Sequence, residues 1–581
     1  MVTQLRTGSF TGHLLSVADR CADRDAVVVL GDEADDAPAT LTYGELDRRA
    51  RALAAVLRER GAPGQRVLVV QSSWHPFATS LLACLYSGAV AVPVPLPGGR
   101  PHHDERLAGI VRDTAAGCAL TDSDSAADVS QLLARAGYGT VTCLAVDTVD
   151  TGRAADWRPP DLDGDSVALL QYTSGSTHDP RGVVVTHANL LANQLSIQRA
   201  LGTGPGSRLG GWLPFHHDMG LVGQFLHPLW LGATAVMLRP RAFVRQPARW
   251  LRMISEYGLT VSGGPDFAYD LCLRRVTDAE LDGVDLSGWR VAVNGGEPVR
   301  PETVRAFTER FAAHGFRPEA FVPCYGLAEG TLLVAGRSAG RSAAREVDPA
   351  ALERGEVRPP RPNRPARTLV GCAPDPATDV RIVDPETSVE LPAGQVGEIW
   401  VRGPGVARGY WKKPAETAAT FHAVTAAGEA GFLRTGDLGV LDEDGGLFVT
   451  GRSKDVIIVA GRNLYPQDVE RRIRRASRMF AANTAFGVPG DQERVVIVQE
   501  VHTATCYDPD FQGLTRVVQR CVEEEFDVAA GGVVLVRVGS VRRTTSGKME
   551  RSAMRRLFLA RKLKPLHQVV TADVERLVAR P

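Results

Sequence analysis

The feature that most constrains the fold is an alternation of short β-branched runs with longer amphipathic segments. Residues 43–61 place apolar side chains at helical spacing, with charged side chains between them. Strand-like runs lie at residues 66–71, 89–94, 166–172, 183–187 and 234–238. Such alternation predicts an α/β fold with parallel sheets, because a helix carries the chain back between parallel strands.

The chain is long enough for more than one hydrophobic core, with 581 residues of which 44% are hydrophobic. The pattern starts again after residue 453, with a strand at 456–461, a helix at 466–480 and strands at 495–501 and 533–538. We therefore expect a large N-terminal domain of stacked sheets and helices (1–453) and a small α+β domain (454–581).

A compositional break lies between residues 337 and 367. This stretch holds several prolines, and eight arginines against four acidic residues. It is predicted to be an inserted surface segment, mostly loop, because prolines interrupt helices and strands.

Charge and cysteine content exclude several classes of protein. The 67 basic and 67 acidic residues cancel, so no net field favours nucleic acid or an anionic membrane. The nine cysteines are scattered singly, which fits neither a disulfide framework nor a zinc site. The N-terminus lacks a secretory pattern, and the uncharged residues 75–99 are broken by Gly88, Pro93, Pro95 and Pro97, as in a buried helix and strand. We expect a cytoplasmic protein without an integral membrane segment.

The stretch TSGSTHDPR, residues 173–181, separates two predicted strands. A Walker A loop would run from a Gly-Lys pair into a helix, but here Gly182 is followed by three valines. Small residues in a turn direct backbone N–H groups at an anion, and the hydroxyl groups add donors. The loop is therefore either a different phosphate-binding turn or a polar hairpin loop.

Five motifs occur in an order that resembles the adenylate-forming superfamily, which includes acyl-CoA synthetases, luciferases and peptide-synthetase adenylation domains. They are TSGST..PRG, YGLAEG, RTGDLG, GRSKDVIIVAGRN and TTSGKMER, and they span nearly the whole chain. GWLPFHHDMGLVGQ, GGPDFAYDLC and NGGEPV look most like the fatty acyl-AMP ligases. The arginine-rich segment lies where that family carries an insertion.

The resemblance implies a set of ATP-binding residues. Thr173, Ser174, Gly175, Ser176 and Thr177 would contact the β- and γ-phosphates, with Arg181 as the cation beside them and Glu329 as a ligand of Mg²⁺. Gly295, Gly296 and Glu297 would border the adenine, with Tyr325 and Gly326 against it, and Asp437 and Arg452 would bind the ribose. One carboxylate suits two ribose hydroxyls because it offers two acceptor oxygens.

The resemblance also implies residues for the acyl substrate and for catalysis. Lys548 would bridge the substrate carboxylate and the α-phosphate, and Lys454 would be the hinge between the domains. His217, with His216, Asp218, Met219, Gly220 and Phe267, would lie along the acyl pocket. We expect His217 to gate or position, since a carboxylic acid is already ionised at neutral pH. The apolar stretches around these residues fit either an alkyl tunnel or core helices.

Two positions depart from the family pattern: His178 replaces the usual glycine and Arg181 the usual lysine. Neither deletes an assigned contact. The implied activity is ATP-dependent formation of an acyl-adenylate from a fatty or related acid, followed by transfer to the phosphopantetheine thiol of an acyl carrier protein. An acyl- or aryl-CoA synthetase and, less favoured, an amino-acid adenylating enzyme or a non-catalytic adenylate-binding protein stay open as alternatives.

Overall fold

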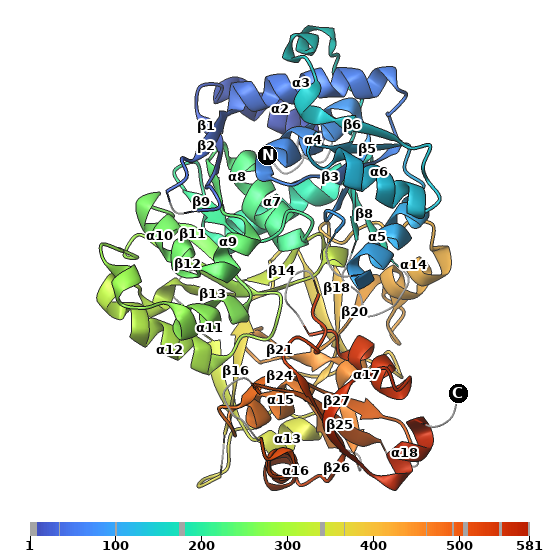
Figure 1. Ribbon diagram of the computed structural model, residues 1–581. Coiled ribbons are helices and arrows are strands. Elements are labelled where there is room, and N and C mark those ends of the chain that lie inside the picture. The colour runs from blue at the N-terminus through green and yellow to red at the C-terminus, as the bar shows by residue number, and fades with distance from the viewer. Residues whose placement is uncertain are drawn as a thin grey trace.

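A computed structural model of the protein describes residues 8–33, 35–98, 101–172, 180–336, 343–364, 366–459, 462–490, 493–503, 509–544 and 549–578. Figure 1 shows a large body of sheets and helices above a smaller C-terminal unit. The fold class expected from the sequence is confirmed: the chain is mixed α/β, with two large parallel-rich sheets in its N-terminal part. No helix in the described ranges has the length and apolar character needed to cross a membrane.

The first sheet has six strands in the order β6-β5-β3-β4-β7-β8. All neighbours are parallel except β7 and β8, which form an antiparallel pair. The strands are β3 (Arg66–Val70), β4 (Val90–Val94), β5 (Cys118–Thr121), β6 (Thr142–Ala145), β7 (Val167–Tyr172) and β8 (Gly182–Thr186). The strands predicted at 66–71, 89–94, 166–172 and 183–187 are thereby confirmed.

The second sheet has eight strands in the order β14-β13-β12-β11-β9-β10-β1-β2, parallel inside and antiparallel at both edges. The strands are β1 (Asp25–Val29), β2 (Ala39–Thr42), β9 (Leu209–Gly211), β10 (Ala235–Met237), β11 (Val261–Gly264), β12 (Val291–Gly295), β13 (Phe321–Gly326) and β14 (Leu333–Gly336). The run at 234–238 is therefore a strand, as predicted.

Helices cover these two sheets. They are α2 (Phe10–Arg20), α3 (Tyr43–Glu59), α4 (Trp74–Ser87), α5 (Pro101–Thr114), α6 (Ala126–Arg135), α7 (His187–Leu201), α8 (His227–Leu231), α9 (Pro240–Arg245), α10 (Ala248–Glu256), α11 (Asp266–Arg275) and α12 (Pro301–Phe311). The predicted helix at 43–61 is α3. Its first turn is fixed by a capping box in which Thr42 and Glu45 exchange side-chain to backbone hydrogen bonds. Leu46, Leu53 and Leu57 of α3 are buried in the largest core cluster.

A third sheet, antiparallel throughout, was not predicted. Its strands are β15 (Ala343–Val347), β16 (Arg367–Cys372), β17 (Asp379–Val383), β18 (Gly397–Arg402), β19 (Ala423–Val424), β20 (Ala430–Leu441) and β21 (Leu447–Arg452), with α14 (Pro414–Phe421) beside β20. The arginine-rich segment is more regular than expected. It supplies β15, paired with β16, and the short helix α13 (Pro349–Glu353).

The C-terminal unit begins after β21 and the 3₁₀ turn η8 (Ser453–Asp455). It has a two-stranded sheet, β22 (Ile457–Val459) and β23 (Arg462–Leu464), and a four-stranded sheet in the order β24-β25-β26-β27. The latter strands are β24 (Phe480–Val488), β25 (Arg494–Val501), β26 (Ala530–Arg537) and β27 (Pro565–Val570), with helices α15 (Pro466–Arg474), α16 (Phe511–Phe526), α17 (Arg551–Leu559) and α18 (Ala572–Val578). The helix predicted at 466–480 ends at Arg474, because Phe480 pairs with Val501 as the start of β24. The domain boundary at 453/454 stays a prediction.

Candidate active site

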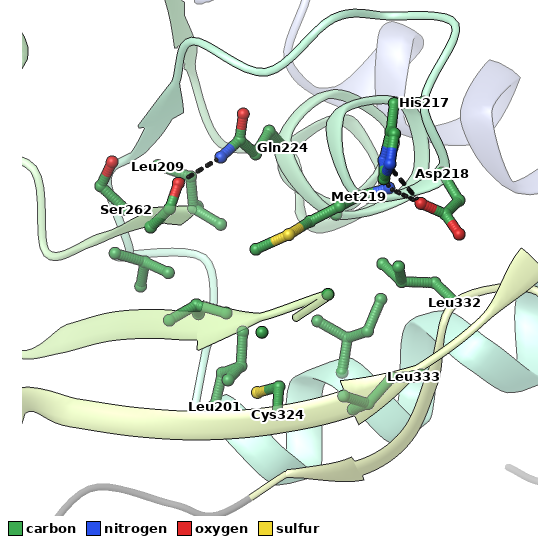
Figure 2. A pocket seen from close by; sticks show the side chains of 18 of the residues that line it. Leu201, Leu209, His217, Asp218, Met219, Gln224, Ser262, Cys324, Leu332 and Leu333 are labelled. Atoms are coloured by element: carbon green, nitrogen blue, oxygen red, sulfur yellow. Dashed lines mark hydrogen bonds and ion pairs between the residues drawn. The ribbon is translucent and has the colours of Figure 1, made fainter. Parts of the chain in front are cut away.

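An apolar cavity of about 100 Å³ lies between helix α7, the ends of strands β9 and β11–β13, and a π-helix, η3 (Met219–Leu226). Figure 2 shows Met219 on one side of this cavity and Leu332 and Leu333 on the other. Leu201 and Leu209 also line it. A cavity with this lining suits an alkyl chain, because it offers few partners for polar groups.

The rim of the cavity carries the predicted residues His217 and Asp218. Nδ1 of His217 lies 2.7 Å from Oδ1 of Asp218, and the same oxygen accepts the backbone N–H of Met219 at 2.7 Å. Figure 2 shows this pair beside the start of η3. Since Asp218 fixes the imidazole and begins the helix, the arrangement fits positioning at the mouth of the cavity.

Close packing under η3 explains two further positions. A Cβ atom on Gly220 would lie 2.3 Å from the carbonyl oxygen of Pro214, so only glycine fits there. The sequence analysis missed Gln224, whose amide donates to the Gly263 carbonyl at 2.8 Å and accepts the Leu213 N–H at 3.1 Å. This buried side chain joins η3 to β11. The sequence does not indicate this role, because Gln224 is an isolated glutamine in an apolar run.

Three predicted nucleotide-binding residues form one cluster, which we call the Asp437 cluster: Tyr325, Asp437 and Arg452. Strands β20 and β21 place Asp437 opposite Arg452. The Tyr325 hydroxyl donates to Oδ2 of Asp437 at 2.9 Å, and Nε of Arg452 donates to Oδ1 at 3.0 Å. Burial and the nearby carboxylate raise the pKa of Tyr325, so its hydroxyl stays a donor. Both carboxylate oxygens of Asp437 therefore have a fixed partner.

A second cluster, the Glu329 cluster, contains Arg181, Glu329 and Tyr410. The Tyr410 hydroxyl donates to Oε1 of Glu329 at 2.7 Å, and the Arg181 guanidinium lies 5.3 Å from the centre of the Tyr410 ring. Nε of Arg181 is 2.7 Å from Oε2 of Glu416. Burial raises the pKa of Glu329 above its ordinary value, which means that its charge is poorly compensated.

Tyr410 was not singled out in the sequence. It reaches Glu329 because its neighbours extend the sheet: Val184 donates its N–H to the Gly409 carbonyl at 2.9 Å, and Trp411 donates to the Gly182 carbonyl at 2.8 Å. Its segment therefore pairs with β8, the strand that follows the predicted phosphate loop. Contacts over more than 200 residues of sequence leave no local signal.

The Glu329 cluster is suited to a cation. Mg²⁺ commonly binds one or two carboxylates together with substrate phosphates and water. Glu329 offers a half-buried carboxylate with a raised pKa. Among the residues that the structure describes, no group of three or more histidine, cysteine or acidic side chains could hold a metal ion by itself. Glu329 could therefore serve as one ligand of a metal that is held together with a nucleotide.

Most of the residues predicted to border the adenine also line this cavity. Gly295, Gly296 and Gly326 line it together with Tyr325. Glu297 accepts the backbone N–H of Phe267 at 2.6 Å through Oε1 and so joins this loop to the start of α11.

The remaining predicted substrate residues lie around the cavity rather than in its wall. Phe267 packs against Trp212, with ring centres 5.9 Å apart, and His216 packs against Phe215 at 5.9 Å. Neither residue belongs to the cavity wall, and Gly220 has the packing role described above. These three stay predictions as substrate-binding residues.

Some predicted residues cannot be placed. Thr173, Ser174, Gly175, Ser176, Thr177, His178 and Lys548 lie outside the described residues. The predicted hinge residue Lys454 lies on η8, directly after β21. Burial lowers the pKa of Lys454, and the nearby Arg452 lowers it further.

The sequence matches the AMP-binding enzyme family over residues 15–411. It is 40% identical to the medium-chain-fatty-acid–[acyl-carrier-protein] ligase JamA of Moorena producens, over 90% of each chain. It is 37% identical to the putative fatty-acid–CoA ligase fadD25 of Mycobacterium tuberculosis, over 90% of this chain and 92% of that one. Among solved structures, it is 33% identical to the fatty acyl-adenylate ligase of L. pneumophila in complex with acyl adenylate and pyrophosphate, with a TM-score of 0.74 over 97% and 98% of the two chains.

Proposed function

Because the chain belongs to the AMP-binding enzyme family, we propose that it uses ATP to convert a fatty acid into an acyl-adenylate and then passes the acyl group to a holo acyl carrier protein. The observation that carries this proposal is a single cavity that is lined both by apolar side chains such as Leu209 and Leu332 and by Tyr325 of the Asp437 cluster. An alkyl chain in the cavity would bring its carboxylate to the nucleotide.

The chemistry requires two displacements. A carboxylate oxygen attacks the α-phosphorus of ATP, and the bond to pyrophosphate breaks. The thiol of the carrier then loses its proton and attacks the acyl carbonyl, and AMP leaves. When bound, Mg²⁺ neutralises phosphate charge. Asp437 and Arg452 would hold the ribose, Glu329 would hold the metal, and the cation Lys548 would stabilise charge on the α-phosphate as it develops.

The arginine-rich segment supports a carrier protein, rather than free coenzyme A, as the acceptor. Its helix α13 contacts the C-terminal unit through Glu353, whose Oε2 lies 2.7 Å from Nη2 of Arg462. Arg367, at the end of the segment, is 2.8 Å from Asp468 and lies over the ring of Tyr465 at 5.0 Å. These contacts hold the small unit in one orientation, and a carrier protein brings binding energy that can compete with them.

The alternative is an acyl-CoA synthetase, which the name of the fadD25 relative favours. An amino-acid adenylating enzyme is less supported, because Asp218, the carboxylate that could meet an ammonium group, already contacts His217 and the Met219 N–H. We propose the cytoplasm as the site of reaction, because the reaction needs ATP and a carrier protein, and both are present there.

One experiment separates the acceptors. The enzyme is incubated with ATP, Mg²⁺ and a medium-chain fatty acid, with either coenzyme A or a holo carrier protein, and the products are weighed by mass spectrometry. We expect acyl-AMP and acyl-carrier thioester but little acyl-CoA. Glu353→Gln, which removes the charge that Arg462 contacts, should raise the acyl-CoA yield about two- to fivefold, the range of a half-exposed ion pair. Efficient acyl-CoA formation by the unaltered protein would favour the synthetase instead.

A further inference from the structure

Positive charge is concentrated near the C-terminus of a chain that is neutral as a whole. Residues 528–572 contain ten arginines and lysines, including three of the six lysines of the protein, and a single acidic residue, Glu550. A bias of this size predicts a basic surface unless acidic side chains from elsewhere neutralise it.

Acidic side chains neutralise only some of these positive charges. Arg551 is compensated, with Nη2 2.7 Å from Glu470 and Nη1 3.2 Å from Asp455. Four other basic residues are both exposed and without an ion pair within 4.0 Å in the part of the chain that the structure describes: Arg537, Arg561, Lys562 and Lys564.

The fold gathers these four side chains at one end of the β24–β27 sheet. Val536 pairs with Pro565 across antiparallel strands β26 and β27, so their neighbours Arg537 and Lys564 lie at the same end. A turn after α17 brings in the other two, because the Lys562 N–H donates to the Leu557 carbonyl at 2.8 Å. We call this surface the basic end.

Two features of the basic end indicate a contact surface. Val538, directly after Arg537, has 53% of its surface exposed, which places an apolar side chain among the charges. Arg561 has a φ of 53°, a left-handed conformation that is unfavourable for a residue with a side chain. The turn that presents Arg561 and Lys562 is therefore a defined structure.

We propose that the basic end is the surface on which the acyl carrier protein docks, through acidic side chains of the carrier. This inference rests on the proposed function. Complementary charge would speed the encounter and orient the partner, and contact with Val538 would add apolar burial. Figure 1 shows α17, which precedes the basic end, on the side of the small unit that faces the large one. A carrier docked here is close to the boundary that its thiol must enter.

A membrane surface fits the basic end less well. Basic segments that lie on membranes present large apolar side chains to the lipid. The apolar side chains of α17 point inward instead: Met554 is fully buried, and Phe558 has 6% of its surface exposed. Apart from Val538, the basic end therefore offers a lipid surface charge but no large apolar side chain to insert.

The test compares two acceptors for the same acyl-adenylate, using the full-length protein. One acceptor is a holo carrier protein and the other is free pantetheine, which offers the thiol without a protein surface. The variant is Arg561→Glu/Lys562→Glu/Lys564→Glu. The matched control, Arg60→Glu/Arg135→Glu/Arg241→Glu, makes the same change in net charge at exposed positions of the large domain. A milder variant with glutamine at 561, 562 and 564 guards against misfolding.

We expect the charge-reversed variant to raise the KM for the carrier about tenfold or more. Acyl-AMP formation should stay unchanged, and so should transfer to pantetheine, which, like transfer to coenzyme A, is expected to be slow in both proteins. The glutamine variant should show a smaller rise, and the control none. Salt should weaken carrier transfer by the unaltered protein more than by the variants.

Equal carrier KM values in the variant and the unaltered protein would overturn the proposal. So would an equal loss with pantetheine, or binding of the unaltered protein, but not the variant, to phosphatidylglycerol vesicles. If the unaltered protein forms acyl-AMP but transfers nothing to any holo carrier, the proposed function fails as well, and this failure is visible without any variant.

Discussion

The Asp437 cluster and the Glu329 cluster contain the same three kinds of side chain in different arrangements. Each has a carboxylate that accepts a hydrogen bond from a buried tyrosine, and each has an arginine nearby. In the Asp437 cluster the arginine bonds directly to the carboxylate, with Nε of Arg452 3.0 Å from Oδ1. In the Glu329 cluster Arg181 lies over the tyrosine ring and pairs with Glu416 instead.

Because of this difference, the charge of Asp437 is compensated by a direct bond to an arginine, whereas the charge of Glu329 is not. Asp437 already has a cation, so neutral hydroxyl groups can share it without further charge, which is what a ribose offers. Glu329 accepts a hydrogen bond from the Tyr410 hydroxyl, and burial raises its pKa, although the charge of the nearby Arg452 acts in the opposite direction. A carboxylate in this state gains most from an added cation. We therefore propose that the two clusters divide nucleotide binding into a metal-independent part and a metal-dependent part.

The largest effect is expected at Glu329. Replacing Glu329 with glutamine keeps an acceptor for the Tyr410 hydroxyl but removes the charge that a metal needs. Acyl-adenylate formation, followed by pyrophosphate release at saturating Mg²⁺, should fall on the order of 100-fold or more. Glu443→Gln, at a surface turn, is the matched control. A fall of less than a few-fold would remove Glu329 from the metal site.

At the other cluster, Asp437→Ala should weaken ATP binding by about 1–3 kcal/mol, because the ribose hydroxyls and Arg452 lose their shared acceptor. Calorimetric titration of the protein with ATP measures this directly. An ATP affinity equal to that of the unaltered protein would mean that the ribose binds elsewhere.

The two tyrosines allow a matched comparison of single hydroxyl groups. Tyr325→Phe and Tyr410→Phe each delete one donor to a carboxylate, with an expected cost of about 1 kcal/mol in nucleotide binding. The loss at Tyr325 should be the same with and without Mg²⁺, whereas the loss at Tyr410 should appear only with Mg²⁺. Tyr43→Phe serves as the control, because its buried hydroxyl donates to the Ala233 carbonyl at 2.6 Å, away from both clusters. The same Mg²⁺ dependence for both tyrosines would contradict the division.

The smallest effect concerns stability without ligands. The pKa of Glu329 lies above its ordinary value of 4.5 in the folded protein, so the charged form opposes folding. The unaltered protein therefore loses stability as the pH rises from 4.5 through the raised pKa. Glu329→Gln stays neutral and should melt about 1–2 °C higher at pH 7.5, with the difference vanishing near pH 4.5. A lower melting temperature at pH 7.5 would show that the charge is well compensated.

Sequence patterns predicted the parts of the fold in which local signals are strong. The valine-rich strands β3, β4 and β8 and the helix α3 were found because buried parallel strands and amphipathic helices have distinct periods. The antiparallel third sheet was missed, since strands such as β17 alternate buried and half-exposed residues over only five positions.

The candidate site shows the same limit. Resemblance drew attention to Tyr325, Asp437 and Arg452, and the structure brings these three into hydrogen-bond contact. The resemblance gave no reason to choose Tyr410 or Gln224. Their partners, Glu329 and the Gly263 carbonyl, lie 81 and 39 residues away in the chain, so their importance depends on long-range contacts that no local pattern records.

The most direct test of the division between the two clusters is the gain in ATP affinity that Mg²⁺ produces, measured by calorimetry for the unaltered protein, Glu329→Gln and Asp437→Ala. The account predicts that Glu329→Gln binds ATP normally without Mg²⁺ but loses most of the gain, whereas Asp437→Ala binds more weakly in both conditions and keeps the gain. Equal weakening of Glu329→Gln with and without Mg²⁺ would contradict it.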